Sequence, residues 1–287
     1  MNTADILKKV RKIEIKTRRL SDHVFGGEYH SHFKGRGMTF SEVRQYQYGD
    51  DIRSIDWNVT ARHNEPYVKV FEEERELTML LMVDVSASEF FGTQTQFKRN
   101  TLTEIAATLA FSAIQNNDKV GLMLFTDTIE LYIPPKKGRS HVLRIIRELI
   151  EYKPKSKKTN IKNALEFLSG VMKKKAIVFL LSDFIDVDYE KALRIVGKKH
   201  DLTGIQVYDK RDWEMINIGW VPVLDLETNK TFTINTNSRK VRDYHRAFFD
   251  KNTKYFKNSF SKTGSGIISL QSDEDYVKKL LGYFKQK

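Results

Sequence analysis

The chain has 287 residues and no cysteine, which excludes disulfide scaffolds, thiolate metal sites, iron–sulfur clusters and cysteine nucleophiles. Lysine and arginine number 49 against 37 aspartate and glutamate residues, and the net charge of +12 favours acidic partners, whether nucleic acid, an anionic membrane surface or an acidic protein face. No apolar run is long enough to span a bilayer, and the N-terminus lacks the apolar stretch of a secretory signal, so we expect a globular, cytoplasmic protein.

Residues 1–75 are predicted to form a basic N-terminal helix followed by short strands and turns. Apolar residues lie among lysines and arginines in residues 2–20, whereas residues 25–75 carry glycines and scattered aromatics without a sustained period. We expect an ordered but irregular, β-rich region. The sequence leaves open whether this region packs against the rest of the chain or stands apart as a small subdomain.

The pattern changes at residue 76, where buried strands begin to alternate with helices. A turn at 126–128 is predicted to fold one strand back into an antiparallel neighbour. This alternation over residues 76–212 predicts an α/β fold with a doubly wound, mostly parallel sheet. The predicted strands are 77–83, 120–125, 129–133, 176–181 and 204–208.

Two of the predicted helices have recognisable beginnings. Residues 101–104 (TLTE) have the form of a capping box, and Thr159-Asn160 can cap the helix that follows. Beyond the alternating region, residues 213–287 are predicted to add further elements to the sheet domain. These are a hairpin around 227–229, a long helix at 239–261, a strand at 266–270 and a final helix from about 273.

Polar residues follow the predicted strands at the edge where ligands bind in open α/β sheets. Asp84, Ser86 and Ser88 come directly after the first buried strand, Thr159 opens a helix, and Asp183 follows the strand 176–181. Two carboxylates and three hydroxyls are hard oxygen ligands that suit Mg²⁺, with Mn²⁺ or Ca²⁺ as alternatives. The sequence therefore predicts a divalent metal site with an open coordination position and no catalytic residue. Alternatively, the Asp84 cluster only caps the following backbone, and Thr159 is a plain N-cap.

The order and placement of these residues resemble the metal-ion-dependent adhesion site (MIDAS) of von Willebrand factor A domains, which are also called integrin I-like domains. The resemblance covers residues 76–212. It implies that Asp84, Ser86 and Ser88 match the first loop of such a site, Thr159 the second and Asp183 the third. It also implies that the metal completes its coordination with a carboxylate of the partner.

Motifs upstream of the sheet domain restrict the resemblance to one family. They are residues 33–40 (FKGRGMTF), 43–51 (VRQYQYGDD), 53–57 (RSIDW) and 60–62 (TAR). With the sheet domain they resemble the bacterial "domain of unknown function 58" family over residues 23–212. Its members often sit beside MoxR-type AAA+ ATPases, and many carry N-terminal membrane spans that are not found in this sequence. The resemblance implies that the partner is a MoxR-type ATPase, its client or another A-domain protein.

We therefore expect a non-enzymatic, metal-dependent protein-interaction module that works in the assembly or maturation of protein complexes. A basic loop precedes Thr159 and is expected to steer an acidic ligand to the metal. Nucleic-acid or other polyanion binding through the basic surface is an alternative, as is a metal-dependent phosphotransferase. The latter would need a second carboxylate at position 86, which is serine. The loop residues expected to contact the partner are Lys153, Lys155, Lys157 and Lys158.

Overall fold

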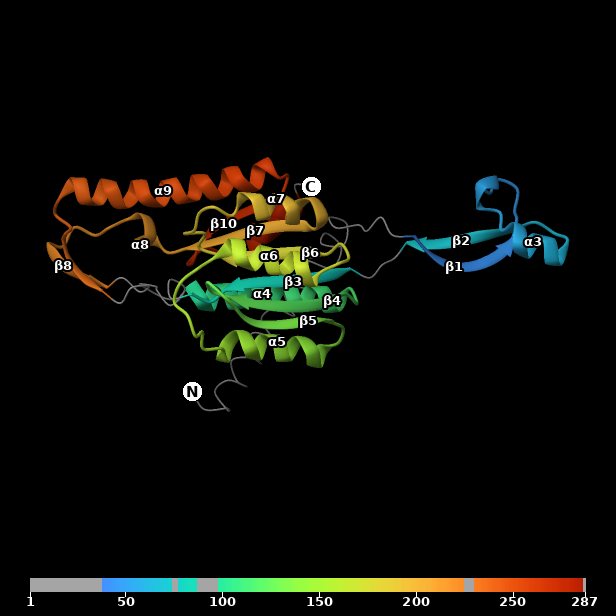
Figure 1. The fold of residues 1–287 in the computed structure, drawn as a ribbon, viewed down its shortest axis with the longest axis horizontal. Helices are drawn as coiled ribbons and strands as arrows, with labels where there is room; N and C mark the ends of the chain where they lie inside the picture. The colour runs from blue at the N-terminus through green and yellow to red at the C-terminus, as the bar shows by residue number, and fades with distance from the viewer. Residues whose placement is uncertain (1–37, 74–76, 87–97, 225–229, 286–287) are drawn as a thin grey trace. The chain divides into compact units, whose positions relative to one another are not determined.

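A computed structural model describes residues 38–73, 77–86, 98–224 and 230–285 (Figure 1). The basic helix predicted in residues 2–20 and the candidate ligand Ser88 lie outside these residues. The chain forms two compact units, one of which is Lys34–Leu77, while the other contains everything from Thr78 onward. Each unit is described separately.

The smaller unit is an antiparallel pair of strands with a helical connection. Strand β1 (Met38–Gln45) pairs with β2 (Tyr67–Glu73). The connection between them contains the 3-10 helix η1 (Ile52–Ser54) and the helix α3 (Trp57–His63). This unit contains most of the upstream motifs.

Several motif residues stabilise the connection in the smaller unit. The guanidinium of Arg44 donates two hydrogen bonds to the carboxylate of Asp50, at 2.7 and 2.8 Å. Gly49 has a φ of +106°, a backbone conformation that glycine adopts without strain. Asp51 caps η1 and Asp56 caps α3 through their side chains. These residues therefore have structural roles within the unit.

The larger unit is built on a six-stranded sheet with the strand order β10-β7-β6-β3-β4-β5. All neighbours run parallel except β4 and β5, which are antiparallel. The predicted α/β fold with a doubly wound, mostly parallel sheet is confirmed. The strands are β3 (Thr78–Asp84), β4 (Lys119–Phe125), β5 (Ile129–Lys136), β6 (Ile177–Ser182), β7 (Asp201–Tyr208) and β10 (Gly266–Gln271).

Helices cover both faces of this sheet (Figure 1). The even-numbered residues Leu80 and Met82 of β3 share a buried apolar cluster with α6, α7 and α9. On the other face, Phe179 of β6 packs edge-on against Phe284 of α10, and α4 contacts β3, β4 and α5. Because central strands are buried on both faces, they appear in the sequence as continuous apolar runs. The helices are α4 (Lys98–Gln115), α5 (Arg139–Glu151), α6 (Ile161–Val171), α7 (Glu190–Lys199), α8 (Lys210–Trp213), α9 (Arg239–Lys262) and α10 (Tyr276–Lys285).

The two predicted helix beginnings have different outcomes. Asn160 is the N-cap of α6, where its side chain accepts a hydrogen bond from the backbone N–H of Asn163, as predicted. The capping box at 101–104 is wrong, because α4 already includes Lys98 and Thr101 lies inside the helix. The Thr101 hydroxyl is buried and donates to the carbonyl of Ser272, 171 residues further along the chain. A tertiary contact therefore takes the hydroxyl that the local pattern assigned to a cap.

A glycine in β7 allows α9 to pack closely on the sheet. A Cβ atom at Gly204 would lie 2.6 Å from a ring carbon of Phe256 and 2.6 Å from one of Phe260. Both phenylalanines are fully buried, and both also contact the ring of Phe184, which follows β6. Gly204 therefore sets how closely α9 approaches both the sheet and the loop after β6.

The hairpin predicted around 227–229 is present as a separate antiparallel pair, β8 (Trp220–Leu224) and β9 (Thr231–Asn235), whose connecting residues 225–229 lie outside the described part. Its base is fixed by Thr236, whose backbone and hydroxyl both donate to the carbonyl of Gly219. Large apolar side chains of the hairpin remain exposed, with Trp220 at 70% and Phe232 at 52%. No helix in the described part of the chain is both long and apolar enough to cross a membrane.

A buried histidine gives the fold an expected pH dependence. His200 is the C-cap of α7 and accepts a hydrogen bond at Nδ1 from the backbone N–H of Ala176. Burial is the main cause that lowers the pKa of His200 to about 4, below its usual value of about 6.5. As the pH falls, the unfolded chain therefore takes up this proton at a higher pH than the folded chain does. The contribution of neutral His200 to the free energy of unfolding is fully present above about pH 6.5 and decreases as the pH falls toward 4.

We expect His200→Gln to remove this part of the pH dependence, which amounts to at most about 3 kcal/mol. Glutamine keeps an acceptor for Ala176 but does not titrate. Urea unfolding at pH 7.5 and pH 4.5 measures the effect, and His63→Gln at an exposed position serves as the control. An unchanged pH dependence in His200→Gln would contradict the assignment.

Candidate functional site

The two candidate carboxylates lie at the same edge of the sheet. Asp84 is the last residue of β3, and Asp183 directly follows β6. These strands are parallel neighbours, with Val83 opposite Leu181, so both carboxylates lie where adjacent strands end. The structure thus brings together the residues that the sequence assigns to the first and third loops.

Asp84 is buried in a polar environment, with 1% of its surface exposed. Its Oδ1 accepts from the backbone N–H of Ser86 at 2.9 Å, and its Oδ2 accepts from the Ser182 hydroxyl at 2.7 Å. Burial, followed by the negative charge of Asp183, raises the pKa of Asp84 to about 7. The hydrogen bond from Ser86 to Asp84 is the one required by the alternative interpretation, in which Asp84 only caps the following backbone. It forms where burial and a neighbouring carboxylate disfavour a negative charge.

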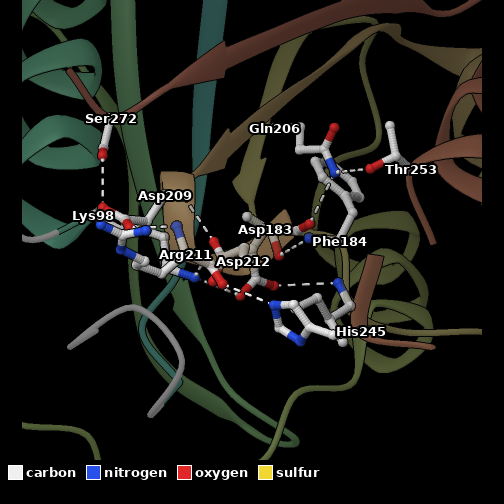
Figure 2. Close-up of polar contacts among 12 residues, drawn as sticks. Lys98, Asp183, Phe184, Gln206, Asp209, Arg211, Asp212, His245, Thr253 and Ser272 are labelled. Atoms are coloured by element: carbon white, nitrogen blue, oxygen red, sulfur yellow. Dashed lines mark hydrogen bonds and ion pairs between the residues drawn. The ribbon is translucent and has the colours of Figure 1, made fainter. Parts of the chain in front are cut away.

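Asp183 is held by hydrogen bonds to its side chain and to its backbone (Figure 2). Its Oδ1 accepts from the backbone N–H of Ile185 at 3.2 Å, and its carbonyl accepts from the amide of Gln206. The next residue, Phe184, has a φ of +57°, a left-handed conformation that is rare for a bulky residue. Stacking on Phe256, with ring centroids 4.0 Å apart, holds this conformation. The aromatic core thus fixes the direction of the loop that carries Asp183.

A lysine that the sequence analysis missed binds Asp183. Lys98 is the first residue of α4 and only 1% exposed, and its Nζ lies 3.1 Å from Oδ2 of Asp183 and 3.3 Å from Oδ2 of Asp212 (Figure 2). Asp212 lies in α8, where it forms a capping box with Asp209. Asp183 lies 85 residues further along the chain, so no local pattern of the sequence indicated this contact.

The second loop is held by hydrogen bonds to residues that follow β4 and β6. Thr159 is half-buried and immediately precedes the N-cap Asn160. The backbone N–H of Asn160 donates to the carbonyl of Thr126 after β4, and that of Ile161 donates to Asp186, three residues after Asp183. Since Asn160 is the cap, the Thr159 hydroxyl is not used for that purpose. Thr159 therefore belongs to the same sheet edge as Asp84 and Asp183.

The basic loop has a fixed backbone and exposed lysines. The Glu130 carboxylate accepts from the backbone N–H groups of Lys155 and Ser156, both at 3.1 Å, and from the Tyr152 hydroxyl at 3.0 Å. The side chains directed to solvent are Lys153, Lys155, Lys157 and Lys158. An acidic residue that the sequence analysis did not single out thus holds the loop in place.

The types of residue at this sheet edge are those that suit a small hard cation. Two buried carboxylates, the residue Ser86 and the hydroxyl of Thr159 belong to one edge, and a divalent ion there would offset the repulsion between Asp84 and Asp183. Among the described residues no group of three or more histidine, aspartate or glutamate side chains could hold a metal. Any ion at this edge would therefore also need hydroxyl, water or partner oxygens.

Comparison with known sequences identifies relatives without an assigned role. An uncharacterized protein of Mycobacterium tuberculosis is 27% identical over 279 residues, which is 96% of this chain and 87% of that protein. The uncharacterized protein YeaD of Bacillus subtilis is 25% identical over 137 residues, 47% of this chain and 31% of YeaD.

Several solved structures resemble the chain at low sequence identity. BatB, a conserved hypothetical protein from Bacteroides thetaiotaomicron, is 12% identical with a TM-score of 0.46, covering 73% of this chain and 98% of BatB. The SpRpn10 VWA domain is 10% identical with a TM-score of 0.40, covering 74% of this chain and 95% of that domain. Finally, the sequence model of the family described as "Protein of unknown function DUF58" matches residues 42–254, and the chain therefore belongs to this family.

Proposed function

We propose that the chain is a non-enzymatic protein-interaction module that binds a divalent cation, Mg²⁺ first, and uses it to capture a carboxylate of a partner protein. The ligands proposed are Asp84, Ser86, Ser88, Thr159 and Asp183. Held by these residues, the cation would supply the positive charge that attracts a carboxylate of the partner.

The observation that carries this proposal is the buried pair of carboxylates at the sheet edge. Asp84 is buried beside Asp183, and its charged form is disfavoured first by burial and then by repulsion from Asp183. Among the described residues no ion pair to Asp84 is formed. Burying two like charges costs free energy that a doubly charged cation can offset. Lys98 already pairs with Asp183, so the charge that a cation would offset is mainly that of Asp84.

The surroundings of the site support an acidic protein as the partner. The basic loop at 153–158 precedes Thr159 and exposes four lysines, which would steer an acidic ligand. In Figure 1 strand β8 lies on the side of the sheet toward which β3 points. The β8–β9 hairpin exposes Trp220 and Phe232. The first half of α9 adds exposed Arg239 and Lys240. Exposed aromatic side chains beside basic ones suit a protein surface with acidic and apolar groups.

A MoxR-type AAA+ ATPase is the first partner that we propose, in the assembly or maturation of protein complexes. This step is supported only by the family resemblance in the upstream motifs. A pull-down with a purified MoxR-type ATPase from the same organism, in Mg²⁺ and in EDTA, tests it. Binding that is equal in both conditions would contradict the role of the metal in the contact.

The metal site itself is tested by thermal unfolding in EDTA, Mg²⁺, Mn²⁺ or Ca²⁺. A ligand bound only by the folded state stabilises it by about 2.7 kcal/mol at a hundred times its Kd. We therefore expect Tm to rise with at least one of these ions at millimolar concentration. Asp84→Asn, which removes the charge with little change of shape, is expected to abolish the rise.

The matched control is Asp201→Asn at the opposite end of the sheet. Asp201 is the first residue of β7 and pairs with Lys175 in an exposed ion pair. This variant should keep the full metal-dependent rise. The absence of a rise for every ion in the wild type, or an equal loss in both variants, would contradict a specific site at Asp84.

A further inference from the structure

We propose that Lys98 is an intramolecular cation that competes with the divalent ion for Asp183 and moves to Asp212 when the ion binds. This inference rests on the proposed metal site and concerns its regulation. It follows from one ammonium group that lies between two carboxylates, only one of which belongs to the candidate site.

The first step is the position of Lys98. Its Nζ contacts Oδ2 of Asp183 at 3.1 Å and Oδ2 of Asp212 at 3.3 Å, and the residue is 1% exposed (Figure 2). A lysine is fully buried only when its charge is paired. The two distances are nearly equal, so the lysine is shared between the two acids.

The second step is the competition for Asp183. One of its oxygens accepts from Ile185 and the other from Lys98. A directly bound Mg²⁺ would lie about 2.1 Å from one of these oxygens. Two cations on one small carboxylate repel each other strongly where little water screens them. Strong pairing of Asp183 with Lys98 and strong coordination of a metal therefore oppose each other.

The third step is the role of Asp212. It is largely buried and lies in the short helix α8, where the backbone N–H of Asp209 donates to its Oδ2 at 2.7 Å. Asp212 is therefore held in place independently of Lys98. It can keep the ammonium paired after Asp183 turns to the metal, so binding of the ion leaves no buried lysine without a counter-charge.

This arrangement leads to opposite expectations for two variants. Lys98→Met removes the competitor and should raise the affinity for Mn²⁺ by about tenfold or more, within the usual range of coupling between sites. Asp212→Asn removes the charge of the second carboxylate, which favours the pairing of Lys98 with Asp183 and should lower the affinity. Asparagine retains an acceptor for the backbone of Asp209, so α8 keeps its capping box.

The test is isothermal titration calorimetry of the full chain with Mn²⁺, using the wild type, both variants and the double variant. If Asp212 acts through Lys98, Asp212→Asn should change the affinity in the wild-type background and leave it unchanged in the Lys98→Met background. A direct effect of the Asp212 charge on the metal would persist in both. Circular dichroism verifies that each variant is folded.

The outcomes separate this inference from the proposed function. If neither the wild type nor Lys98→Met binds Mn²⁺, the metal site itself is wrong. If folded Lys98→Met binds Mn²⁺ as well as the wild type or more weakly, the site stands and the competition by Lys98 is overturned. If Lys98→Met does not fold, Asp212→Asn alone decides, because an unchanged or higher affinity would overturn the inference.

Discussion

Asp84→Asn is expected to stabilise the protein in EDTA at pH 8, by about 1–3 kcal/mol. The substitution removes a buried negative charge beside Asp183 and keeps a side chain that can bond to Ser86 and Ser182. Urea unfolding in EDTA measures the difference. The same variant loses the metal-dependent stabilisation, so its effect changes sign between EDTA and saturating metal.

The difference should also depend on pH in a defined direction. The pKa of Asp84 is raised from its ordinary value near 4 to about 7 in the folded state. The folded state therefore binds the proton more tightly, and wild-type stability decreases as the pH rises from about 4 to 7. The advantage of Asp84→Asn should be smallest near pH 4 and largest above pH 7. A variant less stable than the wild type at pH 8 would mean that the bonds to Ser86 and Ser182 contribute more than the burial of charge costs.

Gly204→Ala is expected to destabilise the protein by about 2–3 kcal/mol, although alanine is normally better tolerated than glycine within a strand. Its Cβ would lie 2.6 Å from ring carbons of both Phe256 and Phe260, which are buried and cannot swing into solvent. Helix α9 would have to move away from β7. Because both rings also pack on Phe184, the loop that carries Asp183 should be disturbed as well.

A matched control exists in α6. Gly170 has no atom within 4 Å of the position that a Cβ would take, and it lies in a helix. Gly170→Ala should therefore stabilise the protein slightly, by about 0.5–1 kcal/mol. Urea unfolding of the two variants measures both effects. Equal effects of the two substitutions would show that the packing of α9 on Gly204 is looser than the structure indicates.

The sheet could be predicted from the sequence because its central strands are buried on both faces. β3 and β6 have apolar residues at nearly every position, and each ends in a polar residue. Their carboxyl ends meet at one edge by the geometry of parallel strands, so the sequence alone predicts that Asp84 and Asp183 lie close together. The helix cap at Asn160 was also predictable, because it depends on residues within one turn.

The rest of the site depends on contacts that local patterns do not contain. Lys98 meets Asp183 across 85 residues of sequence, and Thr101 meets Ser272 across 171. No periodic pattern in the sequence indicates the contact of Lys98. Thr101 has the sequence pattern of a helix cap but is a buried residue within the helix. Glu130 orders the basic loop from a neighbouring strand, 25 residues before the backbone that it binds. These contacts form only after the strands have been arranged, so they could not be predicted from sequence spacing.

The strand order has a consequence for the way in which the chain can fold during synthesis. β3 is the first strand of the sheet to be made and lies near its centre, with β4 and then β5 on one side and β6, β7 and β10 following one another on the other. Every later strand thus joins an existing edge, and none has to insert between two strands that are already paired. A chain that emerges from its N-terminus can therefore build the sheet outward in the order of translation, without first undoing earlier pairings.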